Sequence, residues 1–148
     1  MKKYLLLLLI FILTMILGCQ TPNDANIYYK FIDSSNTEIM LKEKPKNVAV
    51  LFSSFVEIYN LAGGKTNITV KESVERGLVG ENVILVDDGA GKTINNEILI
   101  ASNPDFVIGS LDISEQAKTC KQLNQLGIPS ALFRVESFED YLCVLNMN

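Results

Sequence analysis

The chain contains no histidine and no tryptophan, and basic residues are scarce. Without an imidazole there is no Ser-His or Cys-His catalytic pair and no histidine-ligated metal site. The 148 residues include 13 Lys and Arg against 17 Asp and Glu, for a net charge of -4. Because phosphate binding needs a basic face, this balance excludes a nucleic-acid-binding protein. We expect a binding protein and not an enzyme, with no catalytic residue, no cofactor and no metal site.

The N-terminus has the pattern of an exported protein. Lys2 and Lys3 precede the uncharged stretch Tyr4–Leu17, which is 14 residues long. A helix that crosses the hydrocarbon core needs about 20 apolar residues, so this stretch is too short for a membrane span. A basic start followed by a short apolar stretch is typical of a secretory signal peptide.

The apolar stretch ends in Ile16-Leu17-Gly18-Cys19, which resembles the lipobox of bacterial lipoproteins. The resemblance implies that residues 1–18 are a lipoprotein signal peptide and that Cys19 is diacylated. Two acyl chains anchor a protein stably, whereas one is marginal. We therefore expect a lipid-anchored protein on the extracytoplasmic face of the bacterial cell membrane, with the polar residues 19–26 as a tether. The alternative is an uncleaved anchor in which Cys19 is a packing residue.

Two further cysteines have no paired spacing. Cys120 lies on the apolar stripe of a helical pattern, where a free cysteine behaves as a small buried hydrophobe. Cys143 lies in a separate helical pattern and its environment stays open. Export would permit a disulfide between them, but the spacing gives no reason to expect one.

The hydrophobic pattern predicts an α/β fold. A β-hairpin, expected over 27–32 and 38–41, is joined by the turn-forming residues 33–36. Short apolar runs then alternate with amphipathic segments, which predicts right-handed crossovers and a parallel sheet covered on both faces. The expected strands are 47–52, 66–70, 83–86, 105–109 and 130–135, and the expected helices begin near Ser54 and cover 95–101 and 114–126. Ser54 and Glu57 have capping-box spacing at the first helix. The fold class is a three-layer sandwich with a mainly parallel, Rossmann-like sheet, preceded by the hairpin.

Loops at the carboxyl ends of parallel strands are where open α/β sheets bind ligands. These loops offer hydroxyls, backbone N–H groups and one aromatic ring, which suit binding and not bond breaking. The expected ligand-binding residues are Ser53, Ser54, Phe55, Asp88, Gly89 and Ser110.

The loop at residues 87–93 invites two more specific interpretations, a phosphate-binding loop and a calcium site, and the sequence supports neither. Gly91-Lys92-Thr93 follows a strand, but a phosphate-binding loop needs a glycine where Val86 stands. The adjacent carboxylates Asp87 and Asp88 would also repel phosphate. They do not supply the six to eight spaced oxygens that calcium prefers, so a solvated loop is the better interpretation.

A series of short motifs resembles the iron–siderophore and cobalamin family of substrate-binding proteins for ABC importers. Each motif is weak alone, but their order and spacing span residues 28–145. The matching residues are Pro45-Lys46-Asn47-Val48-Ala49-Val50, Leu61-Ala62-Gly63-Gly64, Asn95-Asn96-Glu97-Ile98, Asn103-Pro104-Asp105-Phe106-Val107-Ile108-Gly109, Leu126-Gly127-Ile128-Pro129 and Glu136-Ser137-Phe138-Glu139-Asp140-Tyr141.

The resemblance implies a receptor of two lobes joined by one long helix, with the solute held between them. Residues 27–136 match the N-terminal lobe, and residues 137–148 match the start of the inter-lobe helix. We expect a truncated receptor without its second lobe, either a gene fragment or one partner of a split protein. The resemblance also implies an ABC importer permease as partner, docked through a surface carboxylate that matches Glu97.

The leading hypothesis is a membrane-anchored receptor for an iron chelate, haem or corrinoid. The lack of histidine argues against histidine-ligated haem and against direct binding of a free metal ion. The alternative is a stand-alone extracytoplasmic lipoprotein whose single α/β lobe binds a protein partner. An enzyme ranks lowest, because no nucleophile–base pair can be named.

Overall fold

A five-stranded parallel sheet forms the centre of the protein. The computed structural model describes residues 27–87 and 93–134. Its strand order is β5-β4-β3-β6-β7, and all four neighbouring pairs are parallel. The strands are β3 (Val48–Val50), β4 (Thr66–Thr69), β5 (Ile84–Leu85), β6 (Phe106–Ser110) and β7 (Ser130–Phe133). The predicted parallel sheet and α/β fold class are therefore confirmed.

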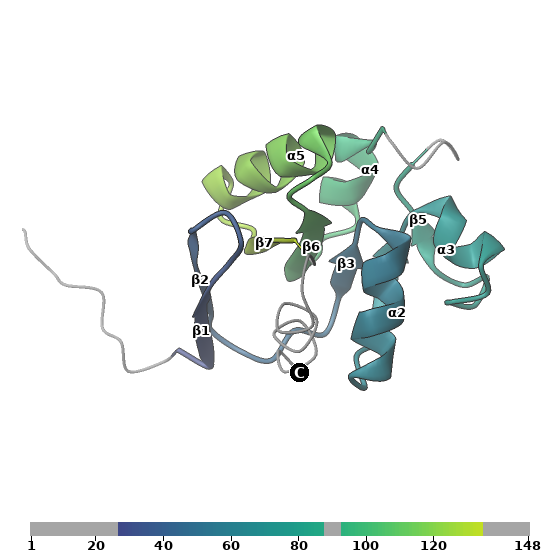
Figure 1. The fold of residues 1–148 in the computed structure, drawn as a ribbon, viewed down its shortest axis with the longest axis horizontal. Helices are drawn as coiled ribbons and strands as arrows, with labels where there is room; N and C mark the ends of the chain where they lie inside the picture. The colour runs from purple at the N-terminus through teal and green to yellow at the C-terminus, as the bar shows by residue number, and fades with distance from the viewer. Residues whose placement is uncertain (1–26, 88–92, 135–148) are drawn as a thin grey trace, which may run out of the picture.

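Helices cover both faces of this sheet, as three-layer packing requires. Figure 1 shows α4 and α5 together on one side of the sheet and α2 on the other. The helices are α2 (Ser53–Leu61), α3 (Lys71–Glu75), α4 (Asn96–Ala101) and α5 (Ser114–Gln125). The short helix α3 was not predicted, whereas the other three lie where the apolar pattern places them.

Successive side chains along β3 point to opposite faces of the sheet, and the core is divided into two clusters, one on each face. Val48 and Val50 face α2, while Ala49 and Leu51 face α4 and α5, and all four side chains are buried. The first cluster includes Phe55, Val56, Tyr59, Phe106, Ile108 and Phe133. The second includes Ile68, Val70, Leu99, Val107, Cys120 and Leu123. A sheet buried on both faces explains why its strands appear in the sequence as continuous apolar runs.

The predicted N-terminal hairpin is present as β1 (Tyr29–Ile32) and β2 (Glu38–Leu41), paired antiparallel. It packs beside α2 on the same face of the sheet. The Phe31 ring stacks on Phe133 at a centroid distance of 6.0 Å and meets Phe106 edge to face at 6.4 Å. These contacts join the hairpin to β6 and β7, the last two strands in the sequence.

The loop of this hairpin also bonds to the outer edge of β7. Asp33 Oδ2 accepts a hydrogen bond from the Leu132 N–H at 2.9 Å, and the Ser34 N–H donates to the Leu132 carbonyl at 2.9 Å. The Arg134 N–H donates to Ser34 Oγ at 3.1 Å. The loop thus satisfies backbone groups that an edge strand otherwise presents to solvent.

The first helix does not use its predicted capping box. Helix α2 begins at Ser53, its N-cap is Phe52, and no side chain caps it. Ser54 and Glu57 therefore lie two positions further into the helix than the capping box requires, and both contact Arg76 instead. At the other end Gly63 has φ +85°, a left-handed conformation that favours glycine after a helix.

Cys120 is fully buried and free, as the apolar stripe predicted. It lies against Gly109 of β6, where an added Cβ would come within 2.9 Å of the Cys120 sulfur. Burial, and secondarily the charge of Asp33, raises the pKa of the Cys120 thiol to about 12. The predicted helical pattern around Cys143 lies outside the described residues.

Cys120 should therefore be inert in the folded protein. Since only the thiolate is nucleophilic, we expect alkylation of Cys120 at pH 8 to be at least ~100-fold slower than in denatured chain. Quantitative mass spectrometry of the Cys120 peptide after iodoacetamide treatment measures this ratio. Comparable rates in the native and denatured protein would contradict the burial described here.

Candidate functional site

The candidate site lies at the carboxyl ends of β3 and β6. From β3 the chain proceeds to β4 and β5 on one side of the sheet, then crosses to β6 and β7 on the other. The loops after β3 and β6 therefore leave the sheet in different directions. A reversal of strand order of this kind marks the carboxyl edge at which open α/β sheets bind ligands.

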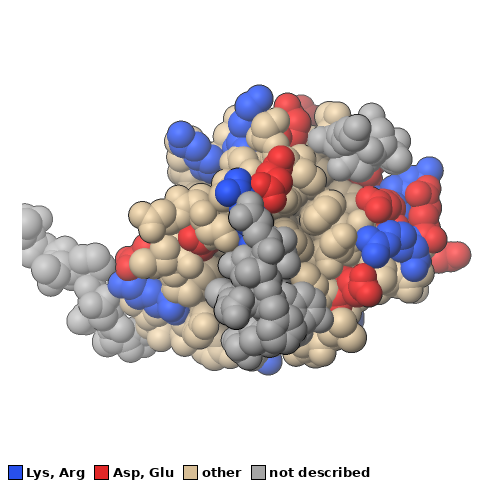
Figure 2. Space-filling view, viewed as in Figure 1, with Lys and Arg blue, Asp and Glu red and all other residues tan. Residues whose placement is uncertain are grey.

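On the β3 side, Arg76 organises the polar groups. Its guanidinium donates to Ser53 Oγ at 3.0 Å and to Glu57 Oε2 at 3.2 Å, with Ser54 Oγ at 3.5 Å. Glu72 lies 3.9 Å away, and the Arg76 side chain is 38% exposed. Figure 2 shows acidic and basic side chains mixed at the end of the molecule that carries α3. The planar, positively charged guanidinium group of Arg76 therefore lies beside the first turn of α2.

The predicted ligand residues on this side differ in exposure. Ser54 is half-buried, whereas the Ser53 hydroxyl is buried beneath Arg76. Phe55 is buried in the core and meets Phe52 edge to face at 5.2 Å. Its ring therefore supports the loop from below, and the half-buried ring nearest to this loop belongs to Phe52.

On the β6 side, Ser110 is buried and linked to Gln116. The Ser110 N–H donates to Gln116 Oε1 at 2.8 Å, and Gln116 Nε2 donates to the Leu51 carbonyl at 2.7 Å. Gln116 is fully buried, so this one side chain joins the end of β6 to the end of β3. It fixes the spacing of the loops that follow β3 and β6.

A second ion pair lies beyond β6. Arg134 Nε donates to Asp112 Oδ1 at 2.7 Å, and both side chains are about half exposed. Neither residue was predicted as part of the site. The predicted Asp88 and Gly89 lie outside the described residues, while their neighbour Asp87 accepts a hydrogen bond from the Lys71 N–H at 2.8 Å. The structure therefore places Ser53 and Ser54 together after β3, with Ser110 at the end of the neighbouring strand β6.

The arrangement suits holding a solute, because hydroxyls and guanidinium groups bind oxygen atoms by hydrogen bonds. In the described part of the chain, no three His, Cys, Asp or Glu side chains gather into a possible metal site. Raised pKa values occur in the core. Besides Cys120, burial and then the charge of Asp105 raise the pKa of Tyr59.

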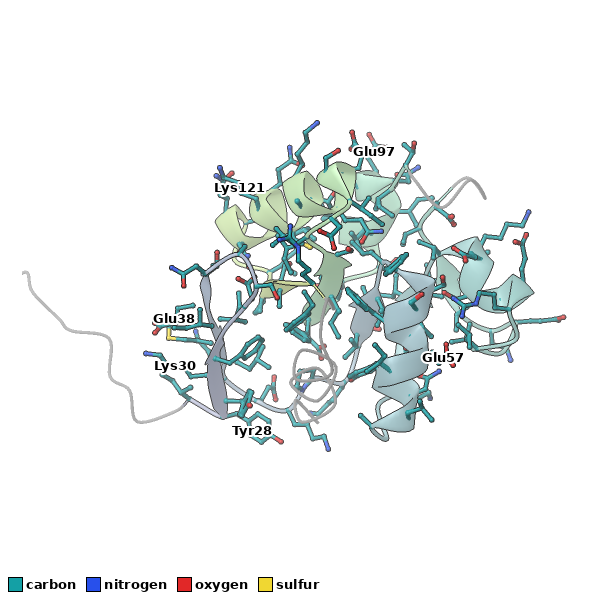
Figure 3. The ribbon with its side chains drawn as sticks, viewed as in Figure 1. Tyr28, Lys30, Glu38, Glu57, Glu97 and Lys121 are labelled. Atoms are coloured by element: carbon teal, nitrogen blue, oxygen red, sulfur yellow. The ribbon has the colours of Figure 1, made fainter. Side chains whose placement is uncertain are left out.

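Glu97, the predicted docking residue, lies in the first turn of α4 and is exposed. Asn95 caps this helix through its side-chain oxygen, which accepts from the N–H groups of Glu97 and Ile98 at 3.1 Å each. Figure 3 shows Glu97 at the top of the molecule, on the side that carries α4 and α5. The carboxylate is therefore exposed to solvent on this surface.

Among residues 27–87 and 93–134, no helix combines the length and apolar character needed to cross a membrane.

Comparison with known proteins gives similarity at the level of structure. No protein-family model matches the sequence, and no curated protein matches it significantly. SirA from Staphylococcus aureus, solved with staphyloferrin B, is 20% identical, with a TM-score of 0.61 over 79% of this chain and 40% of SirA. A variant of the haem-binding protein HmuT is 16% identical, with a TM-score of 0.65 over 86% of this chain and 42% of HmuT. The siderophore-binding protein BauB, bound to acinetobactin and ferric iron, is 14% identical, with a TM-score of 0.60 over 73% and 37%.

This chain thus spans less than half the length of the solved proteins that it resembles. Its described part has the Rossmann-like fold of one lobe of siderophore- and haem-binding proteins.

Proposed function

We propose that this chain is the membrane-anchored substrate-binding component of an ABC importer for an iron chelate, haem or corrinoid. The observation that carries the proposal is the fold, which matches proteins that bind haem or iron–siderophore complexes over 73 to 86% of this chain. The lipobox at Cys19 supports the membrane anchor independently. Residues 27–136 are proposed as the first lobe and residues 137–148 as the start of the inter-lobe helix.

The carboxyl edge is the proposed wall of the solute site. Of the groups expected from the sequence, Ser54 is the best placed for direct contact, and Arg76 adds a donor fork that suits carboxylate or catecholate oxygens. Ser53, Phe55 and Ser110 are buried and would act by shaping the loops. Asp88 and Gly89 complete the proposed site from the loop after β5.

A thermal-shift titration of the full chain tests solute binding. Ferric siderophores, haem and cobalamin are added separately at increasing concentration. A solute at 100 times its dissociation constant stabilises the folded state by about 2.7 kcal/mol. We therefore expect one of these classes to raise the melting temperature by several degrees. No response to any of them would contradict solute binding and favour the alternative, a lipoprotein whose lobe binds a protein partner.

Charge reversal of the docking residue tests the importer partnership. Because an exposed carboxylate can accept a forked contact from a permease arginine, Glu97→Arg should weaken association with the permease about tenfold. Solute binding should be unchanged, since Glu97 lies on α4 and not on the loops that follow β3 and β6. Glu115→Arg, which alters another exposed glutamate in the first turn of α5, is the matched control. Equal association of wild type and Glu97→Arg in a detergent pull-down would contradict this role.

The division into lobes has a separate test. Reading the DNA that follows codon 148, in all frames, asks whether a second-lobe sequence is encoded there. A second lobe would complete the cleft, since good sites bury about 70–90% of a ligand's surface. An unrelated sequence would contradict the proposed truncation.

A further inference from the structure

The outer face of the β1–β2 hairpin is exposed and partly apolar. The register pairs Lys30 with Met40 and Ile32 with Glu38, and its continuation brings Tyr28 beside Lys42. Paired residues of an antiparallel ladder project from the same face of the ribbon. We call these six residues, Tyr28, Lys30, Ile32, Glu38, Met40 and Lys42, the hairpin outer face.

This face differs from the inner one in its exposure. Tyr28 is 53% exposed, Ile32 is 63% exposed and Met40 is 47% exposed, whereas Ile39 and Leu41 on the inner face are buried. Three large apolar side chains of this short hairpin are thus exposed to solvent. Figure 3 shows Lys30 and Glu38 at the outer side of the hairpin, away from the sheet, and Tyr28 at its lower end.

Lysines accompany these apolar side chains. The hairpin and the segment that follows it carry Lys30, Lys42, Lys44 and Lys46 against Asp33, Glu38 and Glu43, which is four basic residues against three acidic ones. The rest of the described chain has six basic residues against nine acidic ones. The Lys30 and Glu38 side chains form a 2.8 Å salt bridge on the face itself. The hairpin and the segment after it therefore have a net charge of +1, whereas the rest of the described chain has a net charge of -3.

The acylated cysteine keeps this face near the membrane. Seven residues, Gln20–Asn26, separate Cys19 from Ile27. A fully extended chain of that length spans at most ~25 Å. Tyr28 and Lys42 therefore lie within reach of the headgroups to which the acyl chains would hold the chain.

We propose that the hairpin outer face rests on the anionic lipid surface of the cell membrane, an inference that depends on the acylation of Cys19 proposed above. Tyrosine is amphipathic and favours the headgroup level, and lysines are attracted to anionic lipids. Ile32 and Met40 supply apolar area between these polar groups. Glu97 lies across the molecule from Tyr28 and Lys30 (Figure 3). With the hairpin outer face on the lipid, the proposed docking carboxylate would therefore lie on the part of the receptor away from the hairpin.

Amine footprinting of the acylated full chain tests the orientation. The protein is reconstituted in vesicles of phosphatidylglycerol and phosphatidylethanolamine, in phosphatidylcholine vesicles, and in detergent micelles, then acetylated briefly. Contact with the anionic surface should slow the labelling of Lys30, Lys42 and Lys44 about threefold in the first vesicles only, and high salt should restore it. Lys118 and Lys121, exposed on α5, are internal controls that should not change.

Variants sharpen this test. Lys42→Glu with Lys44→Glu changes only exposed side chains and should abolish the protection of Lys30, whereas Lys118→Glu with Lys121→Glu should leave it intact. Equal labelling of the hairpin lysines in all three environments would overturn the proposal. Protection that also occurs in micelles and rises with protein concentration would assign the face to a second copy, and so would overturn it as well.

A separate measurement distinguishes the absence of the lipid anchor from the absence of contact between the hairpin and the lipid. The intact mass of the membrane-extracted protein shows whether Cys19 is acylated. If it is not, the proposed anchor fails, and flotation of the unacylated chain with the anionic vesicles then decides the role of the hairpin. Salt-sensitive flotation supports the lipid contact, and its absence overturns it.

Discussion

Replacement of Gln116 by alanine should lower the free energy of unfolding by about 3–5 kcal/mol. The Gln116 side chain is fully buried and makes two hydrogen bonds to the backbone, to the Ser110 N–H at 2.8 Å and to the Leu51 carbonyl at 2.7 Å. Alanine leaves both backbone groups buried without a partner, and each such loss costs about 1–3 kcal/mol. The removed side-chain atoms also leave a cavity, which adds to the cost.

Urea denaturation followed by far-ultraviolet circular dichroism measures this change. Gln122→Ala is the matched control, because Gln122 lies on the same helix and is exposed. Its effect should stay within about 0.5 kcal/mol. A loss below ~1 kcal/mol for Gln116→Ala would mean that water or a neighbour replaces both bonds, contrary to the packing described here.

Asp33→Ala should lower the free energy of unfolding by about 3–4 kcal/mol, because one carboxylate holds the hairpin loop and the sheet edge together. Asp33 Oδ1 accepts from the Ser35 N–H at 2.9 Å, the Ser35 hydroxyl at 2.7 Å and the Thr37 N–H at 2.9 Å. Oδ2 accepts from the Leu132 N–H at 2.9 Å. Alanine removes all four bonds at a residue that is only 6% exposed.

Two further variants test whether the hydrogen bonds of Asp33 account for the lost stability. Asp33→Asn keeps one acceptor oxygen but turns an NH₂ group toward a donor, so it should recover only part of the stability. Glu38→Ala removes an exposed carboxylate of the same hairpin and should cost less than ~1 kcal/mol. Equal denaturation midpoints for wild type and Asp33→Ala would contradict the proposed link between hairpin and sheet.

The parallel sheet could be predicted because its strands are buried on both faces. Such strands give continuous apolar runs, as in β3 and β6, and their connections carry clear helix and turn signals. Cys120 was predicted to be buried for a similar reason, since its helical spacing places it on the apolar stripe of α5. These features depend on periodicity, which a sequence shows directly.

The arrangement at the carboxyl edge was harder to predict. Helix α3 has five residues, too few for a clear period, although the spacing of Lys71 with Glu75 and of Glu72 with Arg76 is typical of helical ion pairs. Phe55 was expected in the site, yet it shares a helical face with Tyr59 and packs in the core. The direction in which a loop side chain points depends on tertiary packing, which local spacing does not specify.

The bonds between the hairpin loop and β7 have a consequence for self-association. With Leu132 and Arg134 occupied by Asp33 and Ser34, the edge of the sheet at β7 offers little template to a foreign strand. The opposite edge is β5, which is only two residues long. Addition of a foreign strand at the β7 edge would thus require the 33–35 turn to detach first.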